Sequence, residues 1–181
     1  MFLIYRILLN LTLIFSPLII LVRLLRNKEH PTRFREKLGF YTKKKVDGKL
    51  IWFHGASVGE VLSVIPLIEK LEKNHKIKQI LITTNTLSSS KVLSNLKLNK
   101  TIHQFFPIDT NFHTKKFLNY WKPSVAFFID SEIWPNMIVN IKKKSISLIL
   151  INARITNKSF KRWKIFSSSS KKFFQKINLC L

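Results

Sequence analysis

Residues 51–68 read IWFHGASVGEVLSVIPLI and predict a strand, a turn and a helix in succession. An apolar run of strand length leads into a turn that contains Gly55, Ser57 and Gly59, and a helix-period pattern starts near Glu60. The two glycines allow a tight turn and the close approach of a ligand. Their spacing differs from G-x-G-x-x-G, so the segment lacks a dinucleotide-binding fingerprint.

The same alternation of strand and helix continues along the chain. Apolar runs of strand length recur at residues 50–53, 80–83, 102–106, 125–129, 148–151 and 177–181. Helix-period stretches begin at Val61, Lys91, Lys115 and Met137. This order predicts an α/β protein with a Rossmann-like parallel sheet and helices on both faces. The serines at 167–170, flanked by lysines, predict an exposed turn.

Acidic residues are scarce, with nine Asp or Glu against 32 Lys or Arg. Ligands of parallel α/β sheets bind at the carboxyl ends of strands, so an acid at such an end is a candidate for chemistry. Four acids qualify by position: Glu60, Asp109, Asp130 and Glu132. The other five lie among cations or on helix surfaces, where we expect solvated pairs: Glu29, Glu36, Asp47, Glu69 and Glu72.

Each candidate acid has a structural alternative. Glu60 could accept a proton from an attacking hydroxyl, or it could only complement the positive end of a helix. Asp130 and Glu132 could orient a substrate or stabilise positive charge, or Glu132 could start a helix whose Trp134 belongs to the core. Three histidines share no common spacing, and we expect structural roles for them: His54, His103 and His113.

Composition excludes several classes of protein. A hydrophobic content of 46% supports a folded core rather than a disordered basic tail. The single cysteine, Cys180, excludes an internal disulfide and a cysteine-ligated zinc site. The net charge of +23 attracts nucleic acid or an anionic membrane, unless it reflects only A+T-rich codons. The cations form no stripe with interleaved aromatic residues, so we expect no nucleic acid partner.

The amino terminus predicts a membrane segment. Residues 7–22 carry no charge, and arginines flank them. A full span needs about 20 apolar residues, so the segment spans only if residues 1–5 join it and Arg6 snorkels; otherwise it lies partly in the interface. A signal peptide is the alternative, but no small-residue cleavage site follows. We expect an anchor helix at 1–25, a basic connector at 26–48 and the folded domain at 49–181, held in the cytoplasm by the cations after the anchor.

Five motifs together carry a resemblance to a known family. They are HGASVGEVLSVIPLIEKL, LITTNTLSSSKV, FFPIDTNF, FFIDSEIWPNMI and LINARITNKSF, in this order. In order and spacing they resemble the amino-terminal domain of bacterial 3-deoxy-D-manno-octulosonic acid (Kdo) transferases, and the RFREKLGFY stretch at 33–41 extends the likeness. The resemblance implies the amino-terminal half of a GT-B glycosyltransferase, which transfers Kdo from CMP-Kdo to the lipid A precursor lipid IVA during lipopolysaccharide biosynthesis. It also implies inversion at the anomeric carbon, with no metal and no cofactor.

The resemblance assigns roles residue by residue. Glu60 matches the general base of the S-V-G-E motif, and Asp130 stands where the family has the Glu that stabilises the transition state. The shorter Asp side chain reduces the reach by one methylene, about 1.5 Å. We expect five further residues at the strand ends to contact substrate: Ser57, Gly59, Glu132, Asn152 and Arg154.

The chain stops in or just after a predicted strand, which we interpret as a missing nucleotide-sugar domain. The leading hypothesis is a half enzyme at the cytoplasmic face of the inner membrane that needs a separately encoded carboxyl-terminal half for activity. The alternative is a catalytically dead remnant that binds anionic lipid or membrane.

Overall fold

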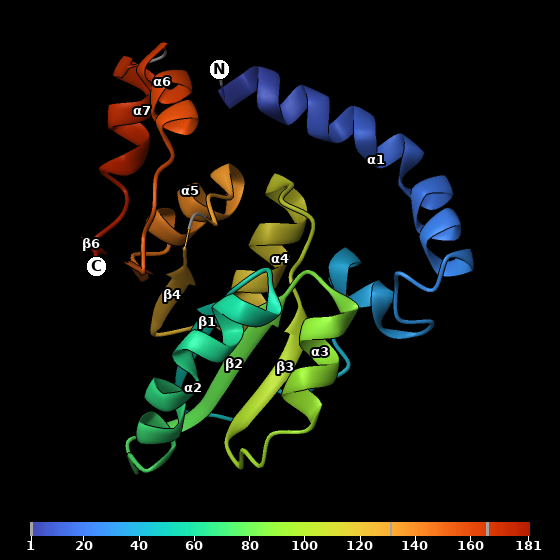
Figure 1. Ribbon diagram of the computed structural model, residues 1–181, viewed down its shortest axis with the longest axis vertical. Helices are drawn as coiled ribbons and strands as arrows, with labels where there is room; N and C mark the ends of the chain where they lie inside the picture. Colours follow the sequence, from blue (N-terminus) through green and yellow to red (C-terminus); the bar gives the residue numbers. More distant parts are fainter. Residues whose placement is uncertain (1, 131, 166) are drawn as a thin grey trace.

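The computed structural model describes residues 2–130, 132–165 and 167–181, which form one sheet with flanking helices (Figure 1). The strands are β1 (Lys49–His54), β2 (Ile77–Thr84), β3 (Thr101–Phe105), β4 (Val125–Ile129), β5 (Ser147–Ile151) and β6 (Leu179–Cys180). The helices are α1 (Phe2–Leu25), the 3₁₀ helix η1 (Arg33–Leu38), α2 (Val58–Glu72), α3 (Leu87–Ser94), α4 (Asn111–Trp121), α5 (Pro135–Lys143), α6 (Asn157–Ile165) and α7 (Ser167–Phe174).

The strand order of the sheet is β3-β2-β1-β4-β5-β6, and every neighbouring pair is parallel. The chain builds outward from β1 to β3, then returns to the other side of β1 and builds outward again. This is the order of a doubly wound, Rossmann-like sheet, so the predicted fold class is confirmed. Between β1 and β4 the connections leave in opposite directions, which opens a crevice at the carboxyl ends of these two strands.

Strand β1 shows why the sheet is covered on both faces. Leu50 and Trp52 belong to the core beneath α4 and α5, whereas Ile51 and Phe53 belong to a second core beneath α2 and α3. Successive side chains of a strand point to opposite faces, so a strand buried on both faces must be apolar throughout. The continuous apolar run of β1 therefore specifies a central strand.

The boundaries of several predicted elements were wrong, and the helix expected from Lys115, for example, begins at Asn111. The helix expected from Lys91 begins at Leu87, because Thr86 caps it and accepts the backbone N–H of Ser89 at 3.3 Å. The last strand is confined to Leu179–Cys180. The serines at 167–170 do not form an exposed turn but begin α7, where Ser170 is buried and its hydroxyl donates to the carbonyl of Trp163 at 2.7 Å.

Glu36 was expected to form a solvated pair, and the structure shows that it is fully buried. Its carboxylate accepts hydrogen bonds from Arg33 Nε at 2.8 Å, from the backbone N–H of Phe105 at 2.8 Å and from the hydroxyl of Thr42. These contacts dock η1 against β3. The stretch before β1 is therefore partly built into the domain, although its composition is that of a basic connector.

Helix α1 is long and apolar enough to cross a membrane, with a mean hydropathy of 2.2 over Ile4–Leu25. Just beyond it, Glu29 is also buried rather than solvated. Its Oε1 accepts from Arg23 Nε and from Lys37 Nζ, each at 2.7 Å. This shared carboxylate joins the end of α1 to η1.

Replacing Glu36 by alanine is predicted to lower the free energy of unfolding by about 3–5 kcal/mol. The change leaves Arg33 without its carboxylate and the N–H of Phe105 without an acceptor. Chemical denaturation measures the loss. Glu69→Ala on the exposed face of α2 is the control, with an expected change within about 0.5 kcal/mol. Equal losses in the two variants would show that η1 is not docked through Glu36.

Candidate functional site

The strand reversal brings the predicted site residues to one edge of the sheet. β1 and β4 are hydrogen-bonded neighbours, with His54 in register with Phe128. Glu60 follows β1 in the first turn of α2, whereas Asp130 and Glu132 follow β4. The two acidic motifs, about 70 residues apart in sequence, therefore lie at the same edge of the sheet, where α/β sheets bind ligands.

Glu60 is held by a capping box. Ser57 is the N-cap of α2, and its hydroxyl accepts the backbone N–H of Glu60 at 3.3 Å. In return, Glu60 Oε1 accepts from the Ser57 hydroxyl at 2.7 Å and Oε2 accepts from the backbone N–H of Ala56 at 2.8 Å. A Cβ at Gly55 would approach the Glu60 Cβ to 3.2 Å, so glycine allows this close turn. Both roles weighed for Glu60 stay compatible with the geometry, because its carboxylate is half-buried rather than sealed.

Glu132 is fixed by two aromatic side chains. Its Oε2 accepts from Trp134 Nε1 at 2.7 Å and lies 3.2 Å from His54 Nε2. Burial raises the pKa of Glu132, but the hydrogen bonds from His54 and Trp134 and the charge of His54 outweigh burial and hold that pKa below its ordinary value. The carboxylate is thus kept ionised at the mouth of the crevice.

The sequence predicts a structural role for His54, and the structure shows the contacts that provide it. It is fully buried at the end of β1, its ring stacks on Phe106 with centroids 3.8 Å apart, and its Nδ1 lies 3.1 Å from the carbonyl oxygen of Thr83. The two ring nitrogens therefore face oxygen atoms from two different segments, Thr83 of β2 and Glu132 after β4. His54 joins β1, β2 and the segment after β4, and it orients Glu132.

Asp130 has a left-handed backbone, with φ of 60°. Only glycine, asparagine and aspartate adopt this conformation readily. Its backbone N–H donates to the carbonyl of Ile151 at 2.8 Å, which fixes the turn after β4 against the end of β5. An aspartate thus suits the local backbone at this position.

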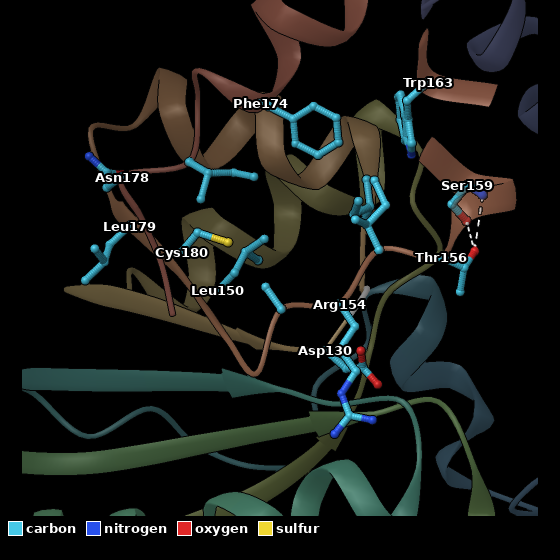
Figure 2. Close-up of a pocket in the computed structure, with 14 residues that line it drawn as sticks. Asp130, Leu150, Arg154, Thr156, Ser159, Trp163, Phe174, Asn178, Leu179 and Cys180 are labelled. Carbon is cyan, nitrogen blue, oxygen red and sulfur yellow. Dashed lines mark hydrogen bonds between the residues drawn. The ribbon is translucent and has the colours of Figure 1, made fainter. Parts of the chain in front are cut away.

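A cavity of about 680 Å³ opens beside Asp130. Trp163 and Phe174 line it from α6 and α7, and Figure 2 shows Asp130 and Arg154 together at its opposite end. The cavity therefore has a largely apolar wall and, at its other end, one carboxylate and one guanidinium. Sequence reasoning placed Asp130 and Arg154 at this edge but missed the two aromatic residues, because the helices that carry them are rich in lysine and serine.

Asp109 has a structural role, because its carboxylate binds the start of α5. It is buried, and its two carboxylate oxygens accept the backbone N–H groups of Asn136 at 3.0 Å and Met137 at 2.7 Å. These donors are the otherwise unpaired groups at the start of α5. Burial raises the pKa of Asp109 to about 6 despite these hydrogen bonds.

The remaining predicted contacts are all at the same edge, but they are more open. Ser57, Gly59, Asn152 and Arg154 are exposed, and Asn152 has a left-handed φ of 54°. Among the described residues no group of three His, Cys, Asp or Glu side chains is placed to hold a metal ion. The site offers carboxylates and a guanidinium, which is a set suited to proton transfer and to binding a charged sugar or phosphate.

A family model described as 3-deoxy-D-manno-octulosonic-acid transferase (kdotransferase) matches residues 32–181. The chain belongs to the Kdo transferase family. Similar proteins named 3-deoxy-D-manno-octulosonic acid transferase occur in Rickettsia bellii, 41% identical over 88% of this chain and 37% of the relative, and in Rickettsia typhi, 47% identical over 71% and 27%. The relative of that name from Haemophilus influenzae is 30% identical over 85% of this chain and 37% of its own length.

The chain spans between 27% and 37% of the length of these Kdo transferases. The family match starts at residue 32, so it contains η1 and the whole sheet but not α1. The resemblance seen in the five motifs is confirmed for the amino-terminal domain. The doubly wound sheet agrees with the amino-terminal half of a GT-B fold.

Glu60→Ala is predicted to destabilise the chain by about 0.5–2 kcal/mol, because it removes the return half of the capping box. Glu60→Gln keeps an oxygen for the N–H of Ala56 and is predicted to cost less than half as much. Thermal and chemical unfolding measure both variants. Equal destabilisation by the two substitutions would show that the capping geometry described for Glu60 is wrong.

Proposed function

We propose that this chain provides the acceptor-binding half of an enzyme that transfers Kdo from CMP-Kdo to lipid IVA in lipopolysaccharide biosynthesis. The observation that carries the proposal is that Glu60 follows β1 whereas Asp130 and Glu132 follow its hydrogen-bonded neighbour β4, with a largely apolar cavity beside Asp130. An acylated sugar acceptor needs both a polar site for its reacting hydroxyl and an apolar surface for its chains.

In this proposal Glu60 is the general base. An acceptor hydroxyl takes the place of the Ser57 hydroxyl beside Glu60 Oε1 and loses its proton to that oxygen as it attacks the anomeric carbon of Kdo. The bond to the CMP phosphate breaks on the opposite face, so the configuration inverts. The leaving group departs as CMP, and the proposed transfer uses no metal, as the family resemblance implies.

Asp130 and Glu132 have separate roles in the proposed reaction. Asp130 stabilises the positive charge that develops on the sugar ring, and Glu132, oriented by His54 and Trp134, holds the acceptor. Arg154 supplies a guanidinium for a phosphate or carboxylate group of the substrates. The remaining contacts of the acceptor are assigned to Ser57, Gly59 and Asn152.

The donor site is assigned mainly to a second domain of the kind that makes up the rest of the relatives' length. That domain could be part of the same polypeptide or a separately encoded carboxyl-terminal half. The enzyme works at the cytoplasmic face of the inner membrane, attached by α1 and by the cations that follow it. A catalytically dead, lipid-binding remnant is the competing function, and the following experiments separate it from an enzyme.

A chimera tests catalysis. In it this chain replaces the matched part of the Rickettsia bellii relative, and transfer of labelled Kdo from CMP-Kdo to lipid IVA is measured. The chimera is expected to be active, and Glu60→Gln to reduce kcat by about 10²–10⁴, because an amide cannot accept the proton. Glu69→Gln, on the exposed face of the same helix, is expected to keep full activity.

The same assay has two outcomes that contradict the proposal. An inactive chimera that folds and binds lipid IVA would establish the remnant instead of the enzyme. A loss below tenfold in Glu60→Gln would leave Glu60 with a capping role only. The 181-residue chain alone is expected to give no transfer, and measurable transfer would contradict the assignment of the donor site to a second domain.

Asp130→Asn in this chimera is predicted to lower kcat at least about tenfold, or about 1.4 kcal/mol of transition-state stabilisation. Asparagine also tolerates the left-handed backbone of this position, so the substitution removes the charge without straining the turn. Asp47→Asn, at an exposed site before β1, is the matched control. An unchanged rate would show that Asp130 does not approach the reacting centre.

A further inference from the structure

Helix α1 has two unlike faces. Its exposed large apolar side chains, at 100° per residue, cover roughly half of the circumference. They are Ile4, Ile7, Leu8, Leu11, Ile14, Phe15, Leu18, Ile19, Leu21, Val22 and Leu25. The opposite, half-buried stripe runs through Leu9, Leu13 and Ile20 and includes the polar side chains of Tyr5, Ser16 and Arg23. One face of the helix is therefore exposed and apolar, whereas the other face is half-buried, although the sequence is apolar nearly throughout.

The first turn of α1 is bound to the domain. The Tyr5 hydroxyl donates to Asp109 Oδ2 at 2.8 Å, and Arg6 Nε donates to Asn136 Oδ1 at 2.8 Å. Arg6 also reaches Asn111 Oδ1 at 3.5 Å. These partners lie just after β3 and at the starts of α4 and α5, which is the carboxyl edge of the sheet.

The last turn of α1 is bound to the same domain. Arg23 and Lys37 share the buried carboxylate of Glu29, and Phe34 and Leu38 of η1 line a pocket together with Ile20 and Leu24. A helix of 24 residues is about 36 Å long, which exceeds the hydrocarbon core of about 30 Å. A helix that spans would have its two ends on opposite sides of the membrane. Here both ends contact one domain, and Figure 1 shows α1 arching over it.

Helix α6 provides a second surface suited to a membrane, at the same end of the molecule as α1. Figure 1 shows α6 and α7 at the end of the molecule over which α1 arches. α6 exposes Phe160 and Ile165 among Lys158, Lys161, Arg162 and Lys164, and Ile155 just before it is exposed too. Apolar side chains interleaved with cations are suited to the headgroup and acyl boundary of an anionic leaflet.

We propose that α1 lies flat in one leaflet of an anionic membrane, held to the domain by the Tyr5–Asp109 and Arg6–Asn136 hydrogen bonds, and does not span the bilayer. The inference rests on the membrane attachment proposed above and goes beyond it by fixing the orientation of the helix. The outer face of α1 contacts acyl chains, and the basic, apolar face of α6 contacts headgroups. The carboxyl edge of the sheet is then turned toward the leaflet from which a lipid acceptor would come.

The two orientations differ in the side of the membrane on which the amino terminus lies. The full chain, with one cysteine added in a short tag before Met1, is reconstituted into sealed vesicles of phosphatidylglycerol and phosphatidylethanolamine. The exposed native Cys180 reports the side of the domain. A membrane-impermeant maleimide polymer labels accessible cysteines, and a gel separates molecules that carry zero, one or two polymers. A helix in one leaflet gives zero or two labels per molecule, whichever way the domain faces, whereas a spanning helix gives one.

A majority of singly labelled molecules would overturn the inference and leave the membrane attachment intact. Failure of the chain to float with the vesicles would overturn the attachment itself, so the two failures are distinguishable. The double variant Tyr5→Phe, Arg6→Gln is expected to raise the singly labelled share at least twofold, because the first turn is released from Asp109 and Asn136. Asn10→Ala, at an exposed position of α1, is the control and is expected to change nothing. An unchanged share in the double variant would show that these hydrogen bonds do not hold α1.

Discussion

The hydrogen bonds of one buried imidazole tie the site to the sheet. His54 ends the central strand β1, contacts Thr83 at the end of β2 and meets Glu132 beyond β4. Such an arrangement exists only because the strand order reverses between β1 and β4, so that both strands end beside the same ring. The reversal supplies the crevice, and the imidazole sets the orientation of the carboxylate within it. Glu60 and Asp130 lie at the same edge of the sheet, the first in the opening turn of α2 after β1 and the second directly after β4.

The sequence was sufficient to predict the class of fold because the central strands are buried on both faces, which makes them continuous apolar runs. It was insufficient for α6 and α7, whose lysines and serines hide the few apolar residues that face the domain. It also failed at Glu36, since the N–H that this carboxylate binds belongs to Phe105, 69 residues away. Charge density along the chain cannot reveal a partner that only folding brings near.

In the candidate site, too, the sequence indicated some residues and could not indicate others. Glu60 and Asp130 follow strand ends, and position alone made them candidates, whose catalytic roles stay predictions. The positioning role of His54 depends on Thr83 and Glu132, which lie 29 and 78 residues away, so spacing gave no signal for it. Asp109 also met the positional criterion, yet the structure uses it to bind the start of α5 and the hydroxyl of Tyr5. For α1, hydropathy predicts length, whereas orientation depends on contacts with residues more than 100 positions later.

The central claim is that the carboxyl edge at β1 and β4 receives the acceptor. Hydrogen exchange with mass spectrometry, on the full chain bound to anionic vesicles with and without lipid IVA, tests it without any donor or second domain. The account predicts that lipid IVA slows exchange in peptides covering residues 55–61 and 132–138, and leaves peptides at the opposite edge of the sheet, 74–78 and 97–101, unchanged. Protection confined to the opposite edge, or to α1 alone, would contradict it.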